Sequence, residues 1–206
     1  KLPQLVALKA DADTKLADVV AKNTAYNNKV NERITAFSGL KSLSTRLVNA
    51  LQTTDATPET IGNAKTFNRK MQGKKASSAQ TPTDPNTPAP TTISTSQQSY
   101  DQLIQHLAGL NSVLEAETSY TPNETDLQVA TLQTKIADLT AKNTAVATAY
   151  ASISNSRIAR NETLYSSSTG LVETANEVKK YIKSVFGASS PQFAQVKGIQ
   201  FKIIKN

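Results

Sequence analysis

Apolar residues recur at steps of three and four along residues 3–37 and 122–164, and this spacing predicts two long amphipathic helices. In the first stretch the series is Leu5, Leu8, Ala12, Leu16, Val19, Asn23, Tyr26, Val30, Ile34 and Phe37. In the second it is Val129, Leu132, Ile136, Leu139, Asn143, Val146, Tyr150 and Ile153. Because such stripes pack at a shallow angle, we expect the two helices to be antiparallel neighbours.

The second long helix carries a start signal in its sequence. Thr121 is the predicted N-cap, Pro122 the first helical residue and Glu124 the third, which together make a capping box. A helix over residues 122–164 would be about 65 Å long. The sequence therefore predicts an elongated bundle.

Three shorter helices are expected to cover the long ones. They span residues 40–53, 99–118 and 170–186. Ser99 with Gln102 forms a weaker capping box, and Gly187 ends the last helix. Pro58 and Pro191, each after a Thr or Ser, start short segments. Alternating apolar residues near the end of the chain, at Ile199, Phe201 and Ile203, favour an extended segment packed along the bundle.

An internal repeat links the two halves of the chain. Residues 15–25 are KLADVVAKNTA and residues 135–145 are KIADLTAKNTA, with eight of eleven positions identical. Weaker likeness continues downstream, where Gly39-Leu40 corresponds to Gly170-Leu171. Duplication explains this pattern. We therefore predict an all-α fold, an elongated antiparallel bundle built from two diverged repeats.

A segment rich in Pro, Ser and Thr separates the halves at residues 72–98. Ile93 is its only large apolar residue, so it is predicted to be a flexible linker. The domain division that follows is 1–71, the first repeat, and 99–206, a helical hairpin with the second repeat and a tail. These parts are expected to form one bundle. The linker is long enough for the halves to pair within one chain or between two chains.

Composition excludes several classes of function. The 206 residues include no Cys and one His, which removes thiolate chemistry, disulfides and sites that need two imidazoles. No apolar run is long enough for a membrane span, and no nucleotide-binding, hydrolase or metalloprotease motif is present. We predict no enzyme activity, cofactor or metal site. Because the sequence starts at Lys1, which suggests trimming or processing, it does not reveal the compartment.

The net charge of +7 is concentrated in residues 1–71, where 11 Lys and Arg oppose 6 Asp and Glu. Clusters at Lys65, Arg69, Lys70, Lys74 and Lys75, and at Lys197, Lys202 and Lys205, are candidate contacts for nucleic acid or another polyanion. Few aromatic residues interleave with them and no groove-reading motif is present. The favoured alternative is a solvated charged face.

Arg157 and Arg160 lie on the continuation of the Ile153 stripe, and they are candidate contacts for a small anion in a site built with Glu162. In the favoured alternative the stripe drifts to Ile158 and Tyr165 and leaves the arginines in solvent.

Two polar residue types on or beside the apolar stripes have both structural and functional interpretations. Asn23 and Asn143, at equivalent repeat positions, are expected to fix helix register by hydrogen bonding, with ligand contact as the alternative. His106 lies at the edge of the Leu103–Leu107–Leu110 stripe. We expect it to be a solvated residue rather than a proton-transfer group or metal ligand.

The first half lacks a counterpart of the helix at 99–118, so part of its apolar stripe is predicted to remain exposed. Leu8, Leu16, Val19 and Tyr26 are the predicted anchors for a second copy or another helical protein. The alternative is that residues 199–204 fold back over the stripe and leave a monomer. The preferred function is a non-catalytic structural or protein-interaction module, ahead of polyanion binding.

The strings YTPNETDLQVATLQTKIADLTAKNTAV, SNSRIARNETLY and GLVETANEVKKYIKSVFGASSPQFAQVKGIQF resemble a group of uncharacterised helical proteins from Bacteroidota. The resemblance covers residues 120–201 best and the first half loosely. It implies an all-helical fold and a bacterial source. It brings no activity and no functional residues.

Overall fold

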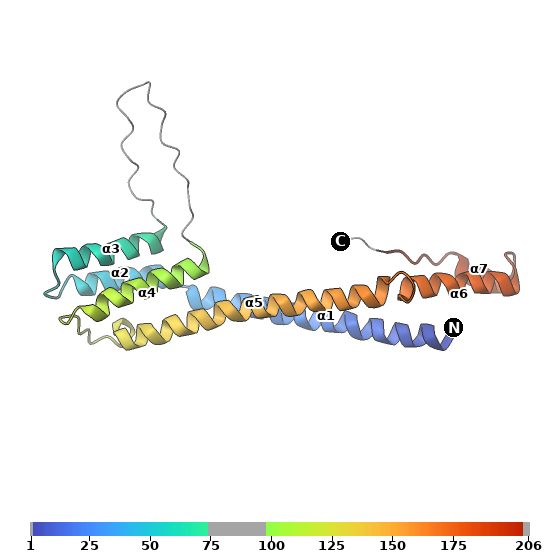
Figure 1. Cartoon of the computed structure of the whole chain (residues 1–206), viewed down its shortest axis with the longest axis horizontal. Helices are drawn as coiled ribbons and strands as arrows, with labels where there is room; N and C mark the ends of the chain where they lie inside the picture. The colour runs from blue at the N-terminus through green and yellow to red at the C-terminus, as the bar shows by residue number, and fades with distance from the viewer. Residues whose placement is uncertain (1, 74–97, 204–206) are drawn as a thin grey trace, which may run out of the picture. The chain divides into compact units, whose positions relative to one another are not determined.

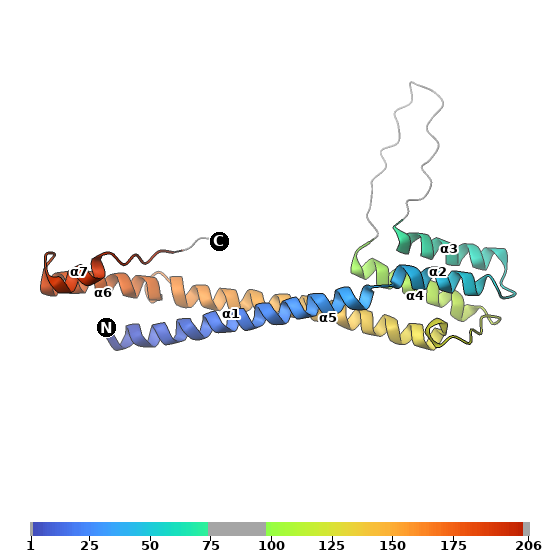
Figure 2. The ribbon, with the colours of Figure 1, turned by 180° about the vertical axis from the view of Figure 1, so that it is seen from behind.

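The computed structural model describes residues 2–73 and 98–203, which are about 80% helical and contain no β-strand. This part of the chain is all-α, as predicted (Figures 1 and 2). In chain order the helices are α1 (Leu2–Phe37), α2 (Leu40–Leu51), α3 (Pro58–Gln72), α4 (Tyr100–Ala116), the 3₁₀ turn η1 (Thr125–Leu127), α5 (Val129–Tyr165), α6 (Leu171–Phe186) and α7 (Pro191–Lys197). Most of the predicted linker, residues 74–97, lies outside the described residues.

The chain forms two compact units. The core unit spans Val30–Val146, and the terminal unit combines Lys1–Lys29 with Ala147–Asn206. The boundaries fall inside α1 and α5, so each long helix contributes residues to both units. The domain division expected at residues 72 and 98 stays a prediction.

The core unit has a continuous aliphatic core between α2, α3 and α4. Its fully buried large side chains are Leu40, Leu47, Leu51, Met71, Leu107, Leu110, Leu114, Leu132 and Leu139. Helix α4 lies close to α3 at Gly109, where a β-carbon would lie 2.5 Å from Cζ of Phe67. Dense packing of unbranched and γ-branched side chains therefore holds this unit together.

Helix α3 is longer than the short proline-started segment that the sequence predicts. Thr57 caps it, its hydroxyl accepting a hydrogen bond from the Thr60 N–H at 3.3 Å, and the helix continues for 15 residues to Gln72. Only Ala64 and Met71, two turns apart, are fully buried on it. Polar residues fill most of the other positions, so the narrow apolar stripe was missed.

Helix α5 begins at Val129 and not at Pro122, so the predicted start of this helix was wrong. The segment before it instead makes a tertiary contact. The hydroxyl of Tyr120 donates to the carbonyl oxygen of Leu127 at 2.9 Å, and both side chains are buried. Burial of these two residues outweighs the local capping signal.

The ends of α4 and α6 agree closely with prediction. The Ser99 hydroxyl accepts from the Gln102 N–H at 3.3 Å, which makes the expected N-cap. The return bond of a capping box is absent, because the buried Oε1 of Gln102 has no partner among the described residues. Gly187, with φ 88°, ends α6, since few other residues adopt that backbone angle.

The terminal unit has a much thinner core. Among the described residues of this unit, the only buried apolar side chains are those of Ala12, Ile153 and Ala175. Polar contacts occur between the two long helices instead: the Thr163 hydroxyl donates to Asp11 at 2.9 Å, and that of Ser156 donates to Asp18. This unit therefore has little hydrophobic stabilisation of its own.

The tail after α7 is non-helical, as predicted, but its apolar side chains are exposed instead of packed. Ile199, Phe201 and Ile203 all face solvent. Lys179 fixes the start of the tail, its ammonium group donating to the carbonyls of Lys197 at 2.7 Å and Ile199 at 2.8 Å. The predicted alternative, in which residues 199–204 cover the α1 stripe, therefore gains no support from the described part of the tail.

Candidate anion-binding cleft

A cleft of about 390 Å³ opens in the terminal unit beside α1. Its lining residues are Val19, Val20, Asn23, Thr24, Arg157 and Arg160. The first four come from two consecutive turns of α1, and the two arginines lie three residues apart on α5, where side chains share a face. Helical spacing on each side thus joins an apolar wall, an amide, a hydroxyl and two guanidinium groups.

The cleft carries positive charge that no described carboxylate neutralises. Arg160 is oriented by Asn161, whose Oδ1 accepts from Nε at 3.1 Å and from Nη2 at 2.7 Å. Arg157 is exposed, and neither arginine has an Asp or Glu oxygen within 4.0 Å among the described residues. Guanidinium groups bind carboxylate and phosphate oxygens, sometimes through two bonds at once. The arrangement suits an anionic group from another molecule.

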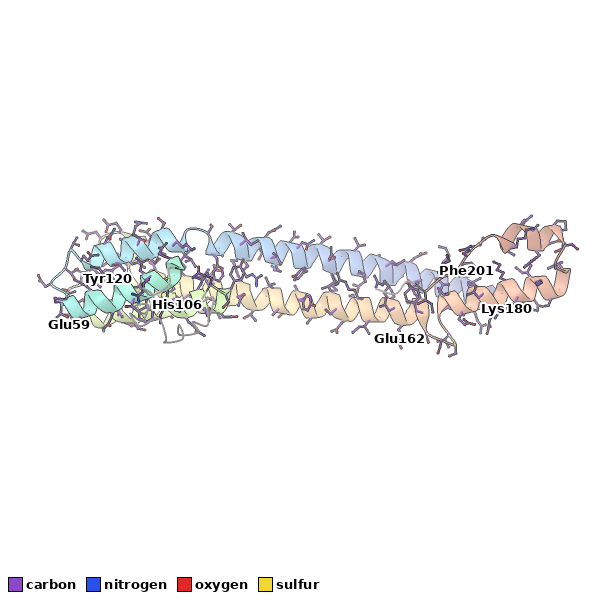
Figure 3. The ribbon with its side chains drawn as sticks, turned by 90° about the horizontal axis from the view of Figure 1, so that it is seen from above. Glu59, His106, Tyr120, Glu162, Lys180 and Phe201 are labelled. Carbon is purple, nitrogen blue, oxygen red and sulfur yellow. The ribbon has the colours of Figure 1, made fainter. Side chains whose placement is uncertain are left out.

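Four predicted site residues meet in this cleft, and Glu162 does not. The structure places Val19, Asn23, Arg157 and Arg160 together. Glu162, which is labelled in Figure 3, is exposed on α5 and is not among the lining residues. Ile158 is 65% exposed, so the stripe does not drift to it. The opposite wall, Val20 and Thr24, was not predicted, because it depends on how the helices pair.

The predicted partner stripe on α1 is partly exposed. Leu16 is 44% exposed, whereas Leu8, Val19 and Tyr26 are half-buried. Lys15 is more buried than Leu16, so the observed seam departs from the predicted one at this turn of α1. The Tyr26 ring contacts that of Tyr150 at a centroid distance of 5.9 Å.

Sequence reasoning missed two exposed apolar residues on α1. Val6 is 62% exposed and Val20 is 65% exposed. They lie 14 residues apart, four helical turns, and so share a face. The sequence contains a signal for this face, because Val6, Asp13 and Val20 follow one another at steps of seven residues beside the predicted stripe.

Asn143 takes part in a polar network in the core unit that the sequence did not predict. Its Oδ1 accepts from Nη1 of Arg33 at 3.0 Å, and its Nδ2 donates to Asp101 at 2.7 Å. The Arg33 guanidinium also lies 4.0 Å from the ring centre of Tyr100, close enough for a cation–π interaction. Asn23 belongs to the other unit, so the proposed register pair gains no support here.

His106 is buried, which corrects the expectation of a solvated side chain (Figure 3). Its Nε2 has no hydrogen-bond partner among the described residues. Burial, and secondly the positive charge of Lys70, lower the pKa of His106. The imidazole is therefore held in its neutral form near neutral pH.

The basic clusters divide between paired and exposed side chains. Lys65 and Arg69 are exposed one turn apart on α3, and Lys70 is half-buried with its ammonium 5.8 Å from the ring centre of Phe67. Lys197 and Lys202 are exposed at the other end of the chain. The remaining members, Lys74, Lys75 and Lys205, lie outside the described residues.

Within residues 2–73 and 98–203, no group of three or more His, Asp or Glu residues could hold a metal ion. No helix in the same ranges is long and apolar enough to cross a membrane. Comparison with protein-family models, with curated proteins and with solved structures finds no match for this chain. The resemblance to helical proteins of Bacteroidota stays a prediction.

Proposed function

We propose that this protein is a non-catalytic helical interaction module, which associates with a second copy or another helical protein through α1. One observation carries the proposal: the terminal unit leaves Val6, Leu16 and Val20 exposed on α1 while burying few apolar side chains of its own. Complete burial of one such side chain contributes about 1.5–3 kcal/mol. A partner helix on this face would supply the core that the unit lacks.

The antiparallel arrangement of the two long helices belongs to the same proposal. Asp11 is bonded to Thr163, and Asp18 to Ser156. The residue numbers rise along α1 as they fall along α5, which supports opposite chain directions. A pair of this kind offers a continuous lateral face to a third or fourth helix.

The two diverged repeats and the elongated bundle are also proposed. The order of elements supports the repeats, because a long helix, a medium helix and a proline-started helix occur as α1–α2–α3 and again as α5–α6–α7. Thr57 and Ser190 cap the third helix of each series in the same way.

Sedimentation velocity of the full chain across micromolar concentrations tests self-association. We expect a particle heavier than the single chain of 22.1 kDa, and we expect Leu16→Asp to shift it toward the monomer. Ala25→Asp is the matched control, because Ala25 is exposed on the opposite side of α1. A clean monomer at every concentration, together with a lower unfolding midpoint for monomeric Leu16→Asp, would show that Leu16 is ordinary core.

Polyanion binding is the second candidate function. The exposure of Lys65 and Arg69 on one face of α3 favours it, since both side chains can reach the same phosphate backbone. Retention of the full chain on heparin at low salt, with a steep loss as salt increases, is the expected result. Lys65→Ala with Arg69→Ala should reduce retention more than Lys9→Ala with Lys22→Ala, which removes the same charge from α1.

A further inference from the structure

Asp13, Leu16 and Val20 form one exposed strip along α1, at positions i, i+3 and i+7. Asp13 is 60% exposed, and its carboxylate forms an ion pair at 2.7 Å with Lys9, four residues earlier on the same helix. Exposed pairs of this kind contribute little to stability. The Asp13 carboxylate is therefore available to another molecule.

The strip borders the arginine cleft directly. Val20 belongs both to the strip and to the lining of the cleft, and Thr24 continues the same face one turn further along α1. A helix lying on the strip would pass beside Arg157 and Arg160. Any carboxylate that it carried at that level would face two guanidinium groups that have no carboxylate partner among the described residues.

We propose that two copies of this chain pair through α1 in antiparallel orientation, so that Asp13 of each copy enters the arginine cleft of the other. This inference rests on the proposed function. The two-fold axis passes at the level of residue 18. Leu16 then packs on Val20 of the partner subunit, and Asp13 lies level with Asn23 of the partner subunit.

The register follows from the spacing of residues on the strip. Asp13 and Val20 are seven residues apart, and Leu16 lies three residues after Asp13, which is the spacing of core positions in a coiled coil. An axis at residue 18 relates positions 16 and 20, and equally 13 and 23. The apolar contact and the charge contact therefore form in a single register.

A second copy fits this face better than an unrelated acidic helix. A two-fold interface must be self-complementary, and here the carboxylate and the arginine cleft lie on the same surface of one chain. Each interface would contain two equivalent Asp–Arg contacts. The pairs also explain how copies with a net charge of +7 can approach each other on this face.

Charge reversal tests the pairing in the full chain. Asp13→Arg, and separately Arg157→Asp with Arg160→Asp, should each weaken dimerisation about tenfold or more in sedimentation equilibrium. Combining all three changes should restore most of the affinity, because opposite charges face each other again. Asp138→Arg is the matched control: Asp138 also pairs with a lysine four residues away, is 54% exposed, and lies in the core unit.

Cross-linking tests the register without changing any charge. The chain contains no cysteine, so a single one can be introduced. Ala17 is exposed one residue from the proposed axis, and Ala17→Cys should form an intermolecular disulfide on mild oxidation. Ala25→Cys, which is distant from the axis, should cross-link far less.

The outcomes separate this inference from the proposed function. If Leu16→Asp dissociates the wild-type dimer, but Asp13→Arg and Asp138→Arg affect dimerisation equally, the proposed interaction module stands and the Asp13 pairing is overturned. Preferential cross-linking of Ala25→Cys would overturn the register. A wild-type chain that stays monomeric at every concentration would overturn both self-association and this inference.

Discussion

A methyl group added at Gly109 would collide with the ring of Phe67. The new β-carbon would lie 2.5 Å from Cζ and 3.0 Å from Cδ1, and closer still to Cε1. The ring has little freedom to withdraw, because it lies between α3 and α4 beside the buried core, with Lys70 near its face. Gly109→Ala must therefore displace the ring or separate the two helices.

The size of the effect comes from two opposing contributions. Alanine in a helix interior is about 1 kcal/mol more favourable than glycine. Forcing extra volume into a packed contact typically costs about 1–3 kcal/mol. Gly62→Ala, in the interior of α3 with nothing within 4 Å of its β-carbon, receives only the favourable contribution. Gly109→Ala should therefore be about 1–3 kcal/mol less stable than Gly62→Ala.

Urea unfolding followed by circular dichroism measures both variants on the full chain. Phe67→Leu should relieve the collision, so a double-mutant cycle between Gly109→Ala and Phe67→Leu should show favourable coupling of about 1 kcal/mol. If Gly109→Ala stabilises the protein as much as Gly62→Ala does, the close approach of α3 and α4 is refuted.

Three further predictions concern single side chains. Because the folded-state pKa of His106 is lowered, its contribution to folding stability is present above the ordinary pKa of about 6.5 and is lost as the pH falls. His106→Gln should therefore flatten the dependence of stability on pH between neutral and mildly acidic conditions, measured by thermal unfolding. The hydrogen bond from Arg46 lowers the pKa of Asp126, so wild type should lose stability relative to Asp126→Asn as the pH falls below about 4. Acid titration of the circular dichroism signal measures this difference. Thr57→Ala removes the N-cap of α3 and should cost about 1 kcal/mol in urea unfolding, whereas Thr53→Ala, outside that cap, should cost less.

The sequence was most informative where local signals and tertiary packing agree. The spacing of apolar residues located the end of α1 at Phe37, and Gly187 located the end of α6 at Phe186. The start of α5 was misplaced because the Tyr120–Leu127 contact is tertiary, and no local pattern encodes it. Lys15 and Leu16 point about 100° apart on either side of the predicted seam, so the rotation of α1 about its axis decides which of them is less exposed.

The candidate site was only half accessible to sequence reasoning. Arg157 and Arg160 could be found because they continue an apolar stripe where charge is unexpected. Val20 and Thr24 could not, because they meet the arginines only when α1 and α5 pair in one particular register. His106 was misjudged for a related reason. An edge position on one isolated helix is buried once a second helix packs beside it.

The thin core of the terminal unit has a consequence for amide hydrogen exchange. Backbone hydrogen bonds there are supported by few buried apolar contacts, so local opening should require much less free energy than opening of the helices around Leu47 and Leu110. A partner that binds only the closed form raises that opening energy by mass action. Amides of residues 3–29 should therefore exchange more slowly as the protein concentration rises, while those of α2 and α4 exchange at a rate independent of concentration.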